Sequence, residues 1–86
     1  MNVRLPTMLE SYAGGTRDVQ ADGDTVAELL RDLDVRYPGI RFRMINEQDQ
    51  LRPHMKIFIN RESINRLDTT VAADDEVVIL QSLSGG

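Results

Sequence analysis

The first twenty residues contain two short stretches with the pattern of strands, separated by a pair of glycines. Residues 2–5 alternate polar and apolar side chains, which is typical of a strand with one buried face. We predict a first strand over residues 1–9, bulged or ended near Pro6 because proline donates no hydrogen bond within a sheet. The Gly14-Gly15 pair predicts a turn. A second strand over residues 16–21 then completes an antiparallel hairpin.

A helix is predicted to begin at Thr25, where a capping box marks the first turn. The Thr25 hydroxyl can accept a hydrogen bond from the Glu28 amide, while the Glu28 carboxylate can reach back to the Thr25 amide. Pro38-Gly39 ends the helix, since proline cannot continue it. One helix face is apolar and is expected to cover a sheet, because these residues recur at helical spacing: Val26, Leu29, Leu30, Leu33 and Tyr37.

The second half of the chain contains one clear strand and weaker signals around it. Residues 55–60 show the two-residue alternation of a strand, and residues 63–65 predict a short strand that returns from a turn. Ahead of these strands, Ile40, Phe42 and Ile45 are spaced to anchor a short helical turn. The polar residues between this turn and the clear strand indicate a surface loop.

The order of the predicted elements defines the fold class. It reads strand, strand, helix, irregular segment, strand, short strand and a last strand over residues 76–81. One helix packed on a mixed sheet of four or five strands is an α+β roll. In the β-grasp form of this roll, the first and last strands lie side by side and parallel at the centre. Val77 and Ile79 would then face the helix, and Val78 and Leu80 the open side of the sheet.

Composition and charge narrow the classes of protein that fit. A chain of 86 residues builds one domain, which buries ~60–65% of its unfolded surface; we expect this domain over residues 1–81, with a flexible tail over residues 82–86. The absence of cysteine excludes disulfides and thiolate sites, and a net charge of −4 argues against a nucleic-acid partner. No apolar run approaches the ~20 residues of a membrane span, and no secretory signal opens the sequence. We therefore expect a cytoplasmic protein that is a monomer when free and has no membrane partner.

Side chains that could carry catalysis or bind a metal are sparse. His54 is the only histidine and lies in a predicted loop, so we assign it no catalytic role. No glycine-rich phosphate loop precedes the helix. The acidic pairs fit turns better than a metal site, which needs more converging ligands: Asp22 with Asp24, and Asp74 with Asp75. We predict no catalytic residue, no metal and no cofactor bound by the chain itself.

Several stretches along the whole chain are shared with a known family. They are Gly23-Asp24-Thr25-Val26, Ile57-Phe58-Ile59-Asn60-Arg61-Glu62, Asp74-Asp75-Glu76-Val77 and the terminal Ser84-Gly85-Gly86. Together with the β-grasp order, they make the chain resemble the ubiquitin-like MoaD/ThiS sulfur carriers. Residues 2–7, the Gly14-Gly15 turn and residues 37–40 look most similar to CysO-type carriers, which serve cysteine biosynthesis. The family usually has Asp-Gly-Asp before the last strand, so the turn here is expected to be shifted or to hold an aspartate at positive φ.

The resemblance implies a carrier that is not itself an enzyme. A ubiquitin-activating-type enzyme (MoeB/ThiF-like), which supplies the ATP and Mg²⁺ site, would adenylate the Gly86 carboxylate. Sulfur would then replace the adenylate as a thiocarboxylate and pass to a biosynthetic acceptor enzyme. The tail residues Leu83, Ser84 and Gly85 would enter a narrow channel of the partner, where glycine permits close backbone approach.

A docking patch is predicted on the open face of the sheet, next to this tail. Phe58, Val78 and Leu80 are apolar residues that the strand alternation places on that face, and Arg4 would lie at its rim.

Two other functions remain open from the residues. The chain could be the small subunit of a sulfur-inserting enzyme such as molybdopterin synthase, with its tail held permanently in the larger subunit. It could also be a ubiquitin-like modifier joined to lysines through Gly86, or an interaction module that is never activated. For a carrier, the recipient pathway is open among cysteine, thiamin, molybdopterin and a sulfur-containing secondary metabolite.

Overall fold

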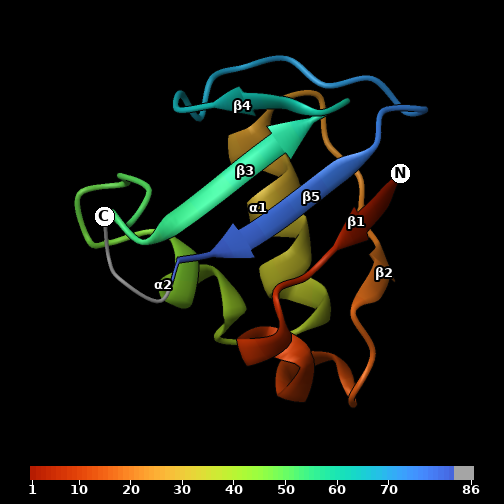
Figure 1. The fold of residues 1–86 in the computed structure, drawn as a ribbon, viewed down its shortest axis with the longest axis vertical. Coiled ribbons are helices and arrows are strands. Elements are labelled where there is room, and N and C mark those ends of the chain that lie inside the picture. Colours follow the sequence, from red (N-terminus) through yellow and green to blue (C-terminus); the bar gives the residue numbers. More distant parts are fainter. Residues whose placement is uncertain (83–86) are drawn as a thin grey trace.

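Within residues 1–82, the part of the chain that the computed structural model describes, five strands form one mixed sheet (Figure 1). The strand order is β2-β1-β5-β3-β4, with β1 and β5 parallel at the centre and the other neighbours antiparallel. The strands are β1 (Asn2–Arg4), β2 (Asp18–Gln20), β3 (Met55–Ile59), β4 (Glu62–Ile64) and β5 (Val77–Gln81). This arrangement confirms the predicted α+β class and the β-grasp roll.

Helix α1 (Val26–Arg36) covers one face of the sheet and closes the core. Val77 and Ile79 are buried against the helix side, as the alternation in the last strand predicted. Among the described residues the core contains no buried polar or charged side chain. Its fully buried large side chains are Leu5, Leu29, Leu30, Leu33, Ile40, Met44, Ile45, Ile57, Ile79, Val3, Val26 and Val77. The fold is therefore stabilised chiefly by the burial of apolar surface.

The start of α1 is capped as predicted, with one difference in the bonding. The Thr25 hydroxyl accepts a hydrogen bond from the Glu28 amide at 3.2 Å. The Glu28 carboxylate, however, accepts from the amide of Asp24 at 3.0 Å, one residue before the predicted donor. Just before this cap, the backbone at Gly23 packs closely against the first turn of α1. Only glycine fits there, because a Cβ at that position would lie 2.6 Å from the backbone nitrogen of Leu29.

The first strand is shorter than the predicted range of residues 1–9. Residues Thr7–Ala13 instead form a 3₁₀ helix, η1. Pro6 stands at the N-cap of η1 with an extended backbone, and it has no amide hydrogen to continue the sheet ladder. Leu9 is buried on the inner side of η1, so the 3₁₀ helix buries the same apolar side chain that a strand would have turned inward.

Helix α2 (Ile40–Met44) confirms the predicted helical turn and corrects one of its anchors. Ile40 and Ile45 are buried, but Phe42 is 61% exposed and does not anchor the turn. Met44 takes the inward position instead. The reason is helical geometry, since residues four apart share a face whereas residues two apart point in nearly opposite directions.

The turn before β5 takes its shape from a side chain and not from a positive φ at an aspartate. Positive φ values outside glycine occur within residues 1–82 at Asp49, Asn60 and Arg61. The Asp75 carboxylate accepts hydrogen bonds from the Ala72 amide at 2.8 Å and from the Asn60 side chain at 2.9 Å. These bonds hold the turn in place, and they lower the pKa of Asp75.

The packing of the core predicts that Leu33 contributes to the stability of the fold and that Val35, two residues further along α1, does not. Leu33 is fully buried, whereas Val35 is 79% exposed on the outer side of α1. Leu33→Ala is expected to lower the free energy of unfolding by ~2–5 kcal/mol, and Val35→Ala to change it by less than about 0.5 kcal/mol. Urea titration measures both. Equal stability of the two variants would contradict the packing of α1 on the sheet.

Asp32 makes the stability of the fold depend on pH. Its carboxylate accepts hydrogen bonds from the Asp22 amide at 2.8 Å and from Arg36 Nε at 2.9 Å, and these bonds lower the pKa of Asp32. The ionised group therefore stabilises the fold above the ordinary aspartate pKa, and this contribution disappears as the pH falls through the lowered value. We expect the free energy of unfolding to decrease from about pH 5 to pH 2, and to decrease less in Asp32→Asn. An identical decrease in both proteins would contradict this role.

Candidate functional site

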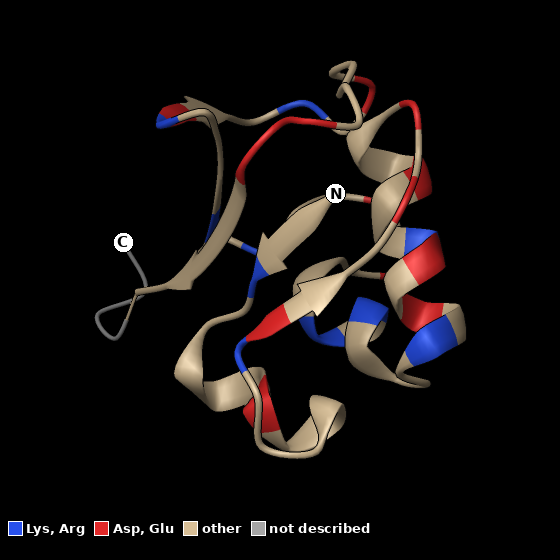
Figure 2. Cartoon of the chain, turned by 90° about the vertical axis from the view of Figure 1, so that its right-hand side faces the viewer, with Lys and Arg blue, Asp and Glu red and all other residues tan. Residues whose placement is uncertain are grey.

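The face of the sheet opposite α1 is uncovered by any described residue. Figure 1 views this face directly, with α1 behind the strands, and Figure 2 shows from the side that α1 lies on one side only. Within residues 1–82 no helix is long and apolar enough to cross a membrane. Because no described element covers this face, a protein partner could dock on it.

The strand register brings the predicted patch residues together on this face. Val78 of β5 is paired with Arg4 of β1 on one side and with Phe58 of β3 on the other. Leu80 follows two residues along β5, so it points to the same face, and its partner across the ladder is Lys56. Leu80 is 45% exposed, while Phe58 and Val78 are half-buried. The four residues thus form a continuous open-face patch, although its role in binding stays a prediction.

The positive charge of Arg4 at the rim of the patch is paired with the carboxylate of Asp18. Arg4 Nε and Nη2 each donate to a carboxylate oxygen of Asp18 on β2, both at 3.3 Å. The pair raises the pKa of Arg4 and lowers that of Asp18. Because both side chains are about half exposed, solvent screens this pair and its contribution to stability is small. Its main effect is to fix the Arg4 side chain at the edge of the patch.

The chain leaves the sheet at the end of β5, next to α2 (Figure 1). The last described backbone bond joins the Ser82 amide to the His54 carbonyl at 2.7 Å. The predicted sulfur-attachment residue and tail lie outside the described residues: Leu83, Ser84, Gly85 and Gly86. The division into a domain over residues 1–81 and a tail over residues 82–86 therefore stays a prediction.

Within residues 1–82, no three His, Cys, Asp or Glu side chains lie close enough to hold a metal ion. The acidic residues take part in turns and ion pairs instead. Asp75 holds the turn before β5, and Asp22 lies near both the Met1 amino group and Arg36, each at 3.4 Å. These acidic side chains therefore have structural partners.

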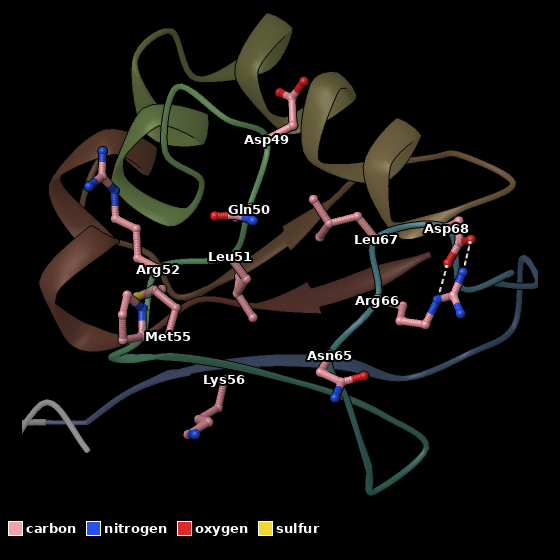
Figure 3. Close-up of a pocket in the computed structure, with 11 residues that line it drawn as sticks. Asp49, Gln50, Leu51, Arg52, Met55, Lys56, Asn65, Arg66, Leu67 and Asp68 are labelled. Atoms are coloured by element: carbon pink, nitrogen blue, oxygen red, sulfur yellow. Dashed lines mark hydrogen bonds and ion pairs between the residues drawn. The ribbon is translucent and has the colours of Figure 1, made fainter.

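Two surface hollows were not predicted, because each is lined by segments far apart in the sequence. The first, of about 590 Å³, lies between the loop before β3 and the segment after β4 (Figure 3). It is lined by both signs of charge, and its Arg66 is already paired with Asp68 at 2.7 Å. The second, of about 640 Å³, lies beside the end of β5 and includes Gln81, Phe42 and Arg43.

The sequence and the fold identify the family. The sequence profile of the ThiS family matches residues 3–86. The sulfur carrier protein CysO of Mycobacterium tuberculosis is 33% identical over 91 residues, covering 100% of this chain and 98% of that protein. Its crystal structure superposes with a TM-score of 0.90 at 32% identity, covering 95% of this chain and 98% of that one. The chain belongs to the ThiS family.

Two further structures support this placement. The Amycolatopsis orientalis BexX/CysO complex contains a chain that matches with a TM-score of 0.90 and 32% identity, covering 99% of this chain and 98% of that one. The small archaeal modifier protein 1 of Haloferax volcanii matches with a TM-score of 0.78 and 29% identity, covering 96% and 97%. These likenesses confirm the ubiquitin-like fold and the predicted resemblance to CysO-type carriers. The relatives are carriers and modifiers, which supports a ubiquitin-like carrier role for this chain.

Proposed function

We propose that this protein carries sulfur as a thiocarboxylate on Gly86. The observation that carries the proposal is similarity over the full chain to a sulfur carrier protein, combined with the Gly85-Gly86 ending. The lack of cysteine is consistent with it, because the sulfur is then held by a main-chain carbonyl carbon and needs no side-chain thiol.

The chemistry requires activation, since a carboxylate is a poor electrophile. The Gly86 carboxylate attacks the α-phosphorus of ATP, which releases pyrophosphate and forms an acyl-adenylate. Sulfide then attacks the acyl carbon, AMP leaves with the bonding electrons, and a thiocarboxylate remains. A persulfide can replace sulfide if a thiol afterwards cleaves the sulfur–sulfur bond. The ATP and Mg²⁺ belong to a MoeB/ThiF-like activating enzyme, which stabilises the developing phosphate charge.

In this proposal the open face of the sheet is the docking platform for that enzyme. The open-face patch adjoins the strand that leads to the tail, and its apolar side chains can be buried against a partner. Four residues follow Ser82 and can span at most ~13 Å when extended. A partner that takes Gly86 into a channel must therefore lie close against this end of the sheet. We propose that the activating enzyme and the sulfur-acceptor enzyme both dock there, in turn.

A second function is supported by the likeness to the archaeal modifier protein. The same acyl-adenylate can be attacked by a lysine amine of another protein, which forms an amide and releases AMP. High-mass adducts that survive reducing denaturation would favour this function, whereas a sulfur-for-oxygen mass change favours carriage.

The tail should tolerate no change at its end. Deleting Gly86, adding one residue after it, or making Gly85→Val should each prevent thiocarboxylate formation with activating enzyme, ATP and sulfide. A displacement of ~1 Å can slow a reaction about a hundredfold, and a branched side chain obstructs close backbone approach. Intact-mass spectrometry measures the exchange of one oxygen for sulfur. All three variants should unfold at the urea concentration of the parent. If the extended protein is loaded without prior trimming, Gly86 is not the attachment residue.

The open-face patch should be required for binding and not for folding. Leu80→Asp is expected to leave the urea midpoint close to that of the parent, because Leu80 is 45% exposed. It should weaken binding to the activating enzyme by about tenfold or more, since a carboxylate would be desolvated without a partner. Val35→Asp, on the far side of the molecule, is the matched control and should bind like the parent. Titration calorimetry measures both affinities, and equal affinities would remove the patch from the interface.

A further inference from the structure

The hollow beside the end of β5 forms a second surface around the point where the chain leaves the sheet. It is built by η1, by α2 and by the loop before β3. Met8 of η1 and Phe42 of α2 are among the most exposed large apolar residues of the described chain, at 59% and 61%. Arg43, Arg52 and Gln81 complete the surface, which we call the exit groove. It adjoins Gln81, the last residue of β5.

Two guanidinium groups in the exit groove are held in place by uncharged partners. Arg43 Nε donates to the Tyr12 hydroxyl at 2.7 Å. Arg52 Nε donates to the Phe42 carbonyl at 2.9 Å, and its guanidinium carbon lies 4.9 Å from the centre of the Phe42 ring. Figure 3 shows Arg52 turned away from Lys56. Because these contacts already restrict the side chains, a ligand would bind them with little further loss of conformational freedom.

The charge of the exit groove differs from that of the rest of the protein. The chain has 14 acidic and 10 basic residues, yet no carboxylate from residues 1–82 lines the groove. The ion pairs found among residues 1–82 use neither Arg43 nor Arg52. In an acidic protein, two restrained arginines that form no ion pair within the described residues leave a local positive charge beside exposed apolar side chains. An acidic segment that also carries an apolar side chain complements this surface.

We propose that the exit groove binds an acidic segment at the channel rim of the activating enzyme; this inference rests on the proposed function. The short tail limits how far that rim can lie from Ser82, to at most ~13 Å for four extended residues. A channel entrance surrounds the segment that enters it, so the rim contacts the surfaces around the exit. The open-face patch then supplies apolar contact, and the exit groove supplies charge.

The test measures how activation depends on carrier concentration. Pyrophosphate release is followed with the activating enzyme from the same organism, at about 50 mM and about 500 mM salt. Arg43→Glu is expected to raise KM by about tenfold or more at low salt with kcat nearly unchanged, and the difference should shrink at high salt. Arg43→Gln, which keeps hydrogen-bonding capacity, should give an intermediate KM. Arg31→Glu, an equal charge change on the exposed side of α1, is the control and should behave like the parent.

Three results would contradict the proposed role of the exit groove. If the parent is activated and Arg43→Glu has the KM of Arg31→Glu at both salt concentrations, the exit groove is not part of the interface, although the proposed function stands. A parent that releases no pyrophosphate contradicts the proposed function as well. Light scattering gives a further check. If the parent has twice its monomer mass and Arg43→Glu does not, a second copy of this chain occupies the groove and the inference is wrong.

Discussion

The parallel pairing of β1 with β5 is the contact on which the rest of the structure depends. Val3 lies opposite Val77, and Arg4 opposite Val78, so the two ends of the described chain meet at the centre of the sheet. Parallel neighbours cannot be joined by a tight turn and need a crossover. Here the crossover includes α1, which covers one face. The other face stays open, and the end of β5 is directed toward α2.

This arrangement separates stability from chemistry. The core is apolar throughout the described residues, and its packing depends on shape and hydrophobicity alone. The groups that could meet a partner lie outside it, on the open-face patch and in the exit groove. The proposed reactive carbon belongs to Gly86, which lies outside the described residues. In the proposed function the activating enzyme supplies the nucleotide, the metal and the catalytic groups, so the carrier itself contributes the docking surface and the carboxylate.

Much of the fold could be predicted because local signals agreed with the tertiary arrangement. The capping box at Thr25 and the alternation in β3 and β5 each specify one element and its buried face. The first strand was predicted too long, because Leu9 is buried equally well by a strand or by a 3₁₀ turn and only Pro6 marked the change. Phe42 was misplaced because residues 40–45 contain four apolar side chains, including Met44, and the sequence does not reveal which of them face inward.

The candidate site was predictable only in part, for a physical reason. Residues on one strand face follow a period of two, so the open-face patch could be deduced from alternation and strand order. The exit groove could not, since it is made where Tyr12, Phe42, Arg43 and Arg52 meet from three separate segments. A run of arginines near a short helix carries no sign, in the sequence alone, of which side chains converge.

The central claim is tested most directly by the intact mass of the protein isolated from its native host. Part of the population should be heavier than the sequence mass by the difference between one sulfur and one oxygen. Fragmentation should place that difference on Gly86, and treatment with an alkylating reagent should label the same residue, since a thiocarboxylate is nucleophilic and the chain contains no cysteine. A protein that is always found at its sequence mass, under conditions in which its activating enzyme is active, would contradict the account.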